Sequence, residues 1–172
     1  MAQDEDLLIA VLNSAPVLAG TPQEQLTGKA GMQLARNFGG TGSPEELATL
    51  IKVRDSLQQA IRGNDQALAD LSQFTSDIVM TPNVTAAGIH WELSAPATSL
   101  LAARTLVAWS EVQHERPGRL RACANTECNL FLVDRSRPGT AKWCSMATCG
   151  NRIKVRAHAK RNRSSAESES RA

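Results

Sequence analysis

The sequence of 172 residues predicts a mainly α-helical fold, in which a helical N-terminal domain with a short strand or hairpin precedes a small four-cysteine domain. Two segments show the hydroxyl, proline and glutamate pattern that is typical of helix starts. Phe, Trp and Tyr make up only 3% of the chain, so Leu, Ala, Ile and Val must form the core, which favours helices. All four cysteines lie within residues 123–149. They are therefore expected to organise a C-terminal domain of their own.

The N-terminal domain, residues 1–114, contains two similar helix starts. Thr21–Glu24 and Ser43–Glu46 each supply a hydroxyl N-cap, a proline at the first helical position and a glutamate for a capping box. The first helix is expected to end at Gly39 and the second at Gly63, because glycine commonly ends helices.

Two further helices and a pair of strands are expected in the same domain. Asn64 can cap a third helix, and a fourth covers about residues 97–113. Between them, residues 81–94 are poorer in helix signals, and Gly88–Leu93 alternates like a short strand or hairpin arm. No apolar run approaches the roughly 18 residues of a membrane span, so no membrane association is expected. The apolar stripes of the four helices are Leu26, Ala30, Leu34 and Phe38; Leu47, Leu50, Ile51, Leu57 and Ile61; Leu68, Leu71, Ile78 and Val79; and Leu100, Ala103, Leu106 and Val107.

The four cysteines form two close pairs, one at residues 123 and 128 and the other at residues 144 and 149. Two such pairs can bring four thiolates to one ion, which is what a tetrahedral structural zinc site requires. The alternatives are two disulfides or four unrelated thiols. Met1–Asp6 is acidic where a signal peptide is basic, so a reducing, cytoplasmic location is expected, in which disulfides are disfavoured. We therefore predict one structural Zn²⁺ bound by Cys123, Cys128, Cys144 and Cys149.

The zinc-binding domain is expected to fold as a knuckle, a β-hairpin and a C-terminal helix. Leu130–Val133 has the pattern of a short apolar strand. Residues five apart lie about 140° apart around a helix, so Cys144 must precede the helix whose first turn carries Cys149. Phe131 and Trp143 are expected to form a small core beside the metal.

Charge divides the chain into two parts. Residues 1–114 hold 6 Lys and Arg against 12 Asp and Glu, whereas residues 115–163 hold 12 Lys and Arg against 3 acidic residues. The second part stays positive even after a zinc tetrathiolate adds about −2, and this charge suits a polyanion. Residues 164–172 are rich in Ser and Glu and are expected to form a disordered tail.

A basic helix is expected over residues 150–163, although the alternation of Ile153–Ala159 would also suit a strand. Such a helix can enter the major groove of DNA, where arginine reads guanine, asparagine reads adenine and other cations contact phosphates. A solvated basic face is the alternative interpretation. The candidate nucleic-acid-binding residues are Asn151, Arg152, Lys154, Arg156, His158, Lys160, Arg161 and Arg163.

The segment Cys144–Lys154, which contains the run Cys149–Arg152, resembles the signature of the CGNR zinc finger. The resemblance covers about residues 115–163 and implies a finger that binds duplex DNA. Such fingers typically follow a bacterial helical domain called ABATE, and the pair is described as a stress-induced transcription regulator. Other residues that match the pattern are Cys123, Cys128, Phe131, Leu132, Asp134, Ser136, Arg137 and Trp143.

Residues 1–114 resemble the ABATE domain in size and position. The opening pattern of that family, Leu-x-Leu-Asp-Phe-Val-Asn-Thr, corresponds here to Leu8–Ser14. Asn13 agrees with it, whereas Ala10 stands in place of the aspartate, so the chain lacks the carboxylate that could carry a ligand role there.

These observations predict a DNA-binding transcriptional regulator whose helical domain binds a small-molecule effector or a second copy of the chain. The alternative is an adaptor, in which the finger is a structural staple and its basic face docks an acidic partner protein. An enzyme is not expected. His90 and His114 are isolated and lack a metal-ligand spacing, and Gly39–Ser43 lacks the lysine of a phosphate-binding loop.

Overall fold

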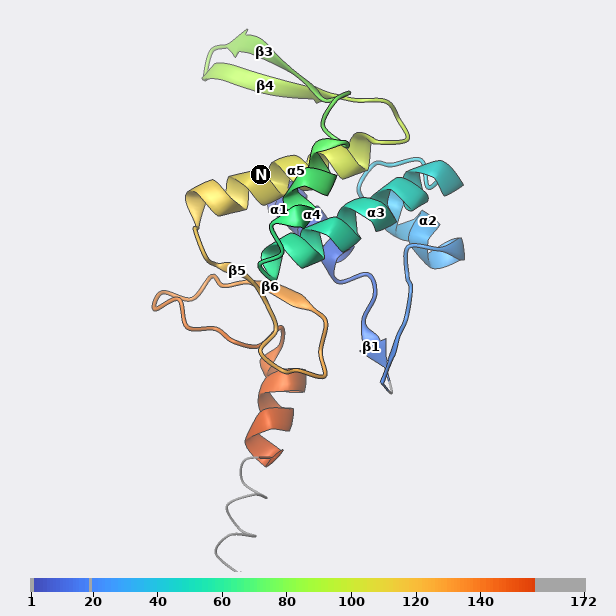
Figure 1. Ribbon diagram of the computed structural model, residues 1–172. Helices are drawn as coiled ribbons and strands as arrows, with labels where there is room; N and C mark the ends of the chain where they lie inside the picture. Colours follow the sequence, from blue (N-terminus) through green and yellow to red (C-terminus); the bar gives the residue numbers. More distant parts are fainter. Residues whose placement is uncertain (1, 19, 157–172) are drawn as a thin grey trace, which may run out of the picture.

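The computed structural model of the protein describes residues 2–18 and 20–156 (Figure 1). Its centre is a group of helices in which α1 packs against α5 and α3, while α2 and α4 pack on α3. The buried side chains of this core are mainly Leu, Val and Ala, as the composition predicts. None of the described helices is long and apolar enough to span a bilayer. The helices are α1 (Ala2–Leu12), α2 (Gly28–Asn37), α3 (Pro44–Ile61), α4 (Gln66–Ser72) and α5 (Leu100–Glu115).

Helix α1 has no counterpart among the helices expected from the sequence. Leu7, Leu8, Val11 and Leu12 have no exposed surface and lie at the middle of the core. Their spacing of one, three and one residues defines one helical face. The sequence did not predict this helix, because no typical N-cap residue precedes it. Its 11 residues also give only a short pattern of apolar spacing.

The expected start of the second major helix is confirmed. Ser43 is the N-cap of α3, its Oγ accepts from Glu46 N at 3.2 Å, and Pro44 occupies the first turn. After the helix, Gly63 adopts a φ of 93°, a left-handed conformation that glycine reaches without strain.

The other expected start, at Thr21, is wrong. Thr21–Pro22 forms strand β2, which pairs with β1 (Val17–Leu18), and α2 begins only after Thr27. The carboxylate that could have completed a capping box has other partners, because Glu24 accepts from Leu26 N at 2.8 Å and binds Arg54 of α3 at 2.7 Å. Within α2 the buried face carries Gly31 and Ala35, while the expected Ala30 is exposed.

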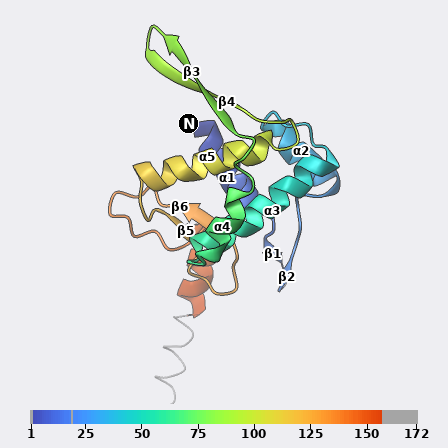
Figure 2. The same cartoon turned by 45° about the horizontal axis from the view of Figure 1, so that its top comes forward.

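The third helix is shorter than expected. Leu71 is buried on α4, but Leu68 is exposed and Val79 belongs to a strand. The expected hairpin is confirmed as strands β3 (Val79–Thr85) and β4 (Gly88–Ser94), which pair antiparallel over their whole length. Figures 1 and 2 show that this hairpin projects from the helical body above α5. The fourth helix is α5, with Ala103 and Leu106 buried as expected.

The C-terminal part packs directly on the helices. Strand β5 (Leu120–Ala122) pairs antiparallel with β6 (Phe131–Val133), and the two strands contact α3 and α1 respectively. Phe131 is only 1% exposed and joins the core of the helical part rather than a separate small core with Trp143. Arg62, the C-cap residue of α3, covers its ring, with the guanidinium carbon 4.4 Å from the ring centroid.

The side-chain amide of Asn13 fixes this packing. It donates to Phe131 O at 3.1 Å and accepts from Phe131 N at 2.7 Å. It therefore acts on the free edge of β6 as a neighbouring strand would. Asn129 makes a second connection, because its Oδ1 accepts from Val17 N at 3.1 Å.

Candidate metal centre

The first two cysteines lie on the loop that joins β5 to β6. Cys123 follows β5 directly, and its backbone N donates to Leu130 O at 2.8 Å, which continues the strand ladder by one step. Beyond it the chain turns, with Cys128 N donating to Asn125 O at 2.9 Å. This turn is the expected knuckle, placed inside the hairpin rather than ahead of it.

The other two cysteines lie at the start of the last described helix. Ala124 N donates to Lys142 O at 2.8 Å, which holds the returning chain beside the knuckle. Ser145 then caps the π-helical turn η1 (Met146–Gly150), where Gly150 N reaches back to Ser145 O at 3.0 Å. Cys149 lies in this turn and Cys144 just before it, so the prediction drawn from their spacing is confirmed. The chain stays helical through residue 156.

The four sulfur atoms converge. All lie within 4.8 Å of one another, and the Sγ atom of Cys144 is 3.7 Å from those of Cys128 and Cys149. A disulfide would bring two sulfurs to about 2.05 Å. A tetrahedral zinc with bonds of about 2.3 Å separates its sulfur ligands by about 3.8 Å. All four thiols are free, and their spacing fits one structural zinc ion.

A buried amide supports the ligands. Asn125 is 1% exposed, and its Nδ2 donates to Cys149 Sγ at 3.5 Å while its Oδ1 accepts from Glu127 N at 3.3 Å. Cys144 N points at Cys123 Sγ, also at 3.5 Å. Such donors stabilise sulfur that carries negative charge. Asn125 is not among the residues predicted from the sequence, where its only signal is a position two residues after a ligand.

Burial affects the thiols in different ways. It raises the pKa of Cys128 and of Cys144 above the ordinary thiol value. Burial also opposes ionisation of Cys149, but hydrogen bonds from Asn125 and the neighbouring thiols outweigh it and lower that pKa. Thiols must lose their protons to bind zinc, so a cation is needed to keep all four ionised at neutral pH.

Gly150 allows close packing beside the metal site. A Cβ at this position would lie 2.7 Å from Met146 Sδ and 3.3 Å from Trp143 Cδ1. Glycine therefore lets the turn that carries Cys149 lie against Trp143, which is half-buried beside the metal site.

A buried carboxylate orders the loop that leads to Cys144. Asp134 accepts from Ser136 N at 2.9 Å, from Ala141 N at 3.0 Å and from Arg121 Nη2 at 2.5 Å. Hydrogen bonds from Ser136, with help from Ala141 and Arg121, hold the pKa of Asp134 below its usual value despite burial. Asp134 thus connects the beginning of the loop, at Ser136, with its end, at Ala141.

The described part of the predicted nucleic-acid surface follows the last ligand. Asn151, Arg152, Lys154 and Arg156 are exposed on the helix, and Ile153 is half-buried, as expected for the side that packs back. Arg156 forms a two-fold contact with Glu127, at 3.0 and 2.9 Å. The remaining candidates, His158, Lys160, Arg161 and Arg163, lie outside the described residues, as does the expected tail at 164–172.

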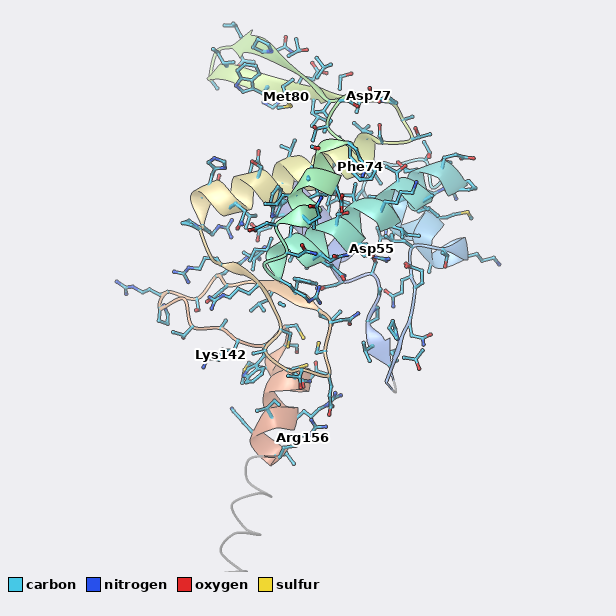
Figure 3. The ribbon with its side chains drawn as sticks, viewed as in Figure 1. Asp55, Phe74, Asp77, Met80, Lys142 and Arg156 are labelled. Carbon is cyan, nitrogen blue, oxygen red and sulfur yellow. The ribbon has the colours of Figure 1, made fainter. Side chains whose placement is uncertain are left out.

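Several other cations of this part are paired with acids. Arg116 and Arg135 both bind Glu5 at 2.6 Å, and Arg119 and Arg121 lie beside Asp134. Figure 3 labels Lys142, close to the metal site, and Arg156, on the helix beyond it. Among the described residues of the C-terminal part, from residue 115 onward, the exposed cations that form no ion pair are Arg137, Lys142, Arg152 and Lys154.

Fold and site together define a helical protein with a C-terminal four-cysteine zinc-binding module. Residues 119–162 match the family model described as CGNR zinc finger. This segment is therefore a CGNR zinc finger, and the convergence of Cys123, Cys128, Cys144 and Cys149 is consistent with one structural zinc ion. A search of curated proteins finds no match. The resemblance of residues 1–114 to an ABATE domain stays a prediction.

Proposed function

We propose that the protein is a zinc-dependent, DNA-binding transcriptional regulator, in which the basic helix after Cys149 contacts duplex DNA. The observation that carries the proposal is the position of Arg152 and Lys154. Both are exposed, neither forms an ion pair with a described residue, and both follow a metal ligand within five residues. The metal cage fixes the backbone there, and bidentate contact between arginine and guanine requires such a fixed backbone.

The shape of the finger supports the same proposal. In Figure 1 the last helix projects away from the helical body, from the side of the finger opposite α1 and α5. A helix with its side chains is about 10–12 Å across, and the major groove is about 12 Å wide. The helical part carries twice as many acidic as basic residues, so repulsion from phosphates would orient the protein with its finger toward DNA.

The pairing of Arg156 with Glu127 is compatible with this role. Both side chains are more than half exposed, and ion pairs at the surface contribute little to stability. A phosphate can therefore replace Glu127 as the partner of Arg156 at little cost.

The test is duplex binding measured by fluorescence anisotropy over a range of salt concentrations. Arg152→Ala is expected to weaken binding to a preferred site by about 1–3 kcal/mol and to reduce sequence preference. Lys154→Ala is expected to weaken binding to all sequences and to make the salt dependence shallower. The matched control is Lys52→Ala, because Lys52 is an exposed cation on α3, outside the finger.

The proposal is contradicted if the wild-type protein shows no salt-dependent affinity for any duplex below about 100 μM, near the weak end of non-specific binding. An affinity that Lys52→Ala reduces as much as Arg152→Ala would place the DNA contact outside the finger.

The adaptor function remains the second candidate because a specific observation favours it. Glu5 of α1 binds Arg116 and Arg135, and Asn13 binds the backbone of β6. The finger therefore has a structural role in this chain in addition to any ligand that it binds. An adaptor would bind an acidic protein through Arg152 and Lys154 and would show no affinity for duplexes, so the same titration separates the two functions. Neither function assigns a catalytic step to the protein.

A further inference from the structure

The projecting hairpin β3–β4 has one apolar and one mostly polar face. Its register places Met80 opposite Leu93, Pro82 opposite Trp91, and Val84 opposite Ile89. Side chains alternate between the two faces of a strand, so these six residues share one face. The other face carries Val79, Thr81, Asn83, Thr85, His90, Glu92 and Ser94.

The apolar face is not covered by the described part of the chain. Val84 is 86% exposed, Ile89 64% and Trp91 54%. An isolated two-stranded hairpin is marginally stable in water, and a contiguous apolar patch of this kind marks an interaction surface. Figures 1 and 2 agree that the hairpin leaves the helical body rather than packing flat on it.

The charges near the hairpin select the kind of partner. Residues 63–103 contain no Lys or Arg, while Asp65, Asp70, Asp77 and Glu92 are acidic. Nucleic acid and anionic membranes would therefore be repelled. The six residues of the apolar face carry no charge, which is typical of the centre of a protein–protein interface.

We propose that this face is a homodimer interface, in which the hairpins of two copies pack with their apolar faces together about a two-fold axis. A face without charge is complementary to itself, as a two-fold interface requires. Covering the six residues in both copies would remove on the order of 1,000 Å² from water, near the lower limit for a specific interface.

A groove beside the hairpin gives the second copy a place to enter. It has a volume of about 670 Å³ and lies between Met80, Trp91 and Leu93 of the hairpin and Leu100 and Val107 of α5. Charged side chains also line it, among them Glu92, Arg104 and Glu111. Figure 3 shows Met80 on the side of the hairpin that faces α5. Packed sheets lie about 10 Å apart, so the hairpin of the partner would lie over the apolar face.

Pairing of strand edges is a poorer alternative. Pro82 lies within β3 and has no N–H, so the outer edge of that strand lacks a donor at its centre. Edge strands that contain proline resist extension by another chain. Packing through the faces does not depend on this edge.

The test is sedimentation velocity of the zinc-loaded full chain from 1 to about 200 μM, without DNA, because an interface at this lower size limit is expected to be in the micromolar range. A reversible monomer–dimer equilibrium is expected. Val84→Asp should raise its dissociation constant at least tenfold. The matched control, Val79→Asp, changes the same residue type on the same strand, is 56% exposed and lies on the opposite face. It should leave the dissociation constant within about twofold.

Three outcomes would overturn the proposal. One is a monomer over the whole range, and another is a dimer that Val84→Asp and Val79→Asp affect equally. The third is a monomer that sediments with phosphatidylcholine vesicles and loses this property in Val84→Asp, which would assign the face to a membrane. Because DNA is absent, the result is independent of the proposed regulatory function.

Discussion

Asn125 is a buried polar residue whose amide donates to a metal ligand. Its Nδ2 lies 3.5 Å from Cys149 Sγ, and its backbone and side-chain oxygens accept from Cys128 N and Glu127 N. A tetrathiolate concentrates negative charge on sulfur, and a donor aimed at one sulfur offsets part of it. The Asn125 side chain therefore helps to close the turn of the knuckle and stabilises negative charge on the Cys149 sulfur.

Replacing Asn125 should weaken zinc binding without removing a ligand. Asn125→Ala is expected to lower zinc affinity by about 10- to 100-fold, the usual effect of losing such a partner. Competition with a chromophoric chelator measures the change. Thr126→Ala, at the exposed neighbouring position of the same turn, is the control. Equal affinities for Asn125→Ala and the control would show that the amide has no influence on the metal.

The sequence predicts the ligands of this site but not their supporting partners. Two close pairs of cysteines have few possible roles, so the four ligands and the placement of Cys144 before the helix could be predicted from their spacing. An asparagine in a turn has many possible roles. Its role becomes visible only when the fold brings Cys149, 24 residues further along the chain, next to Asn125.

At the level of elements, α1 is joined to the finger through Glu5. This carboxylate is 7% exposed and binds Arg116, after α5, and Arg135, after β6. Burial opposes ionisation of Glu5, but hydrogen bonds from Arg135 and Arg116 outweigh it and hold its pKa below the usual value. A lowered pKa means that the ionised carboxylate stabilises the folded state above the unfolded pKa.

The stability contributed by Glu5 should therefore be lost as the pH falls. Glu5→Gln is expected to reduce the free energy of unfolding by roughly 1–3 kcal/mol at pH 7, because the bonds to two charged partners weaken. The difference from wild type should shrink as the pH falls below about 4.5, the ordinary pKa of glutamate, and vanish below the folded pKa. Urea unfolding at several pH values measures it, and any loss of zinc at low pH affects both proteins.

The control for this experiment is Glu45→Gln, because Glu45 is exposed in the first turn of α3. It should change the free energy of unfolding by less than about 0.5 kcal/mol. If the difference between Glu5→Gln and wild type stays constant from pH 7 to pH 3, the carboxylate is not held ionised by its arginine partners.

The same level shows where sequence patterns fail. Thr21 and Ser43 begin almost identical motifs, yet only Ser43 caps a helix. The difference lies in tertiary contacts, because Glu24 binds Arg54 on α3, 30 residues away, and the N–H of Leu26, instead of the Thr21 N–H that a capping box requires. Local patterns predicted α3, α5 and the β3–β4 hairpin, whose signals are strong, and misplaced segments whose partners are distant.

In the whole molecule, finger and helices share one hydrophobic core. Leu120 and Phe131 from β5 and β6 belong to the same buried cluster as Leu7 and Leu57 of α1 and α3. The core thus continues across the boundary predicted at residue 115. The opposite charges of the two parts, which the sequence assigns to separate functions, also hold the parts together through Glu5.

This shared core means that zinc should stabilise more than the finger. The metal fixes the loop between β5 and β6, and β6 places Phe131 among the helices and offers its backbone to Asn13. A ligand that binds only the folded state stabilises every element that unfolds with its site.

Removal of zinc with a strong chelator should therefore lower the melting temperature of the helical circular-dichroism signal, most of which arises from residues 2–115. A finger attached by a linker would leave that signal unchanged. Phe131→Ala provides the comparison, because loss of a buried phenyl ring costs about 3–5 kcal/mol and weakens the connection while keeping all four ligands. Chelation should then lower the melting temperature of Phe131→Ala by less than that of wild type. If chelation leaves the helical melting curve of the wild-type protein in place, finger and helices unfold independently despite their common core.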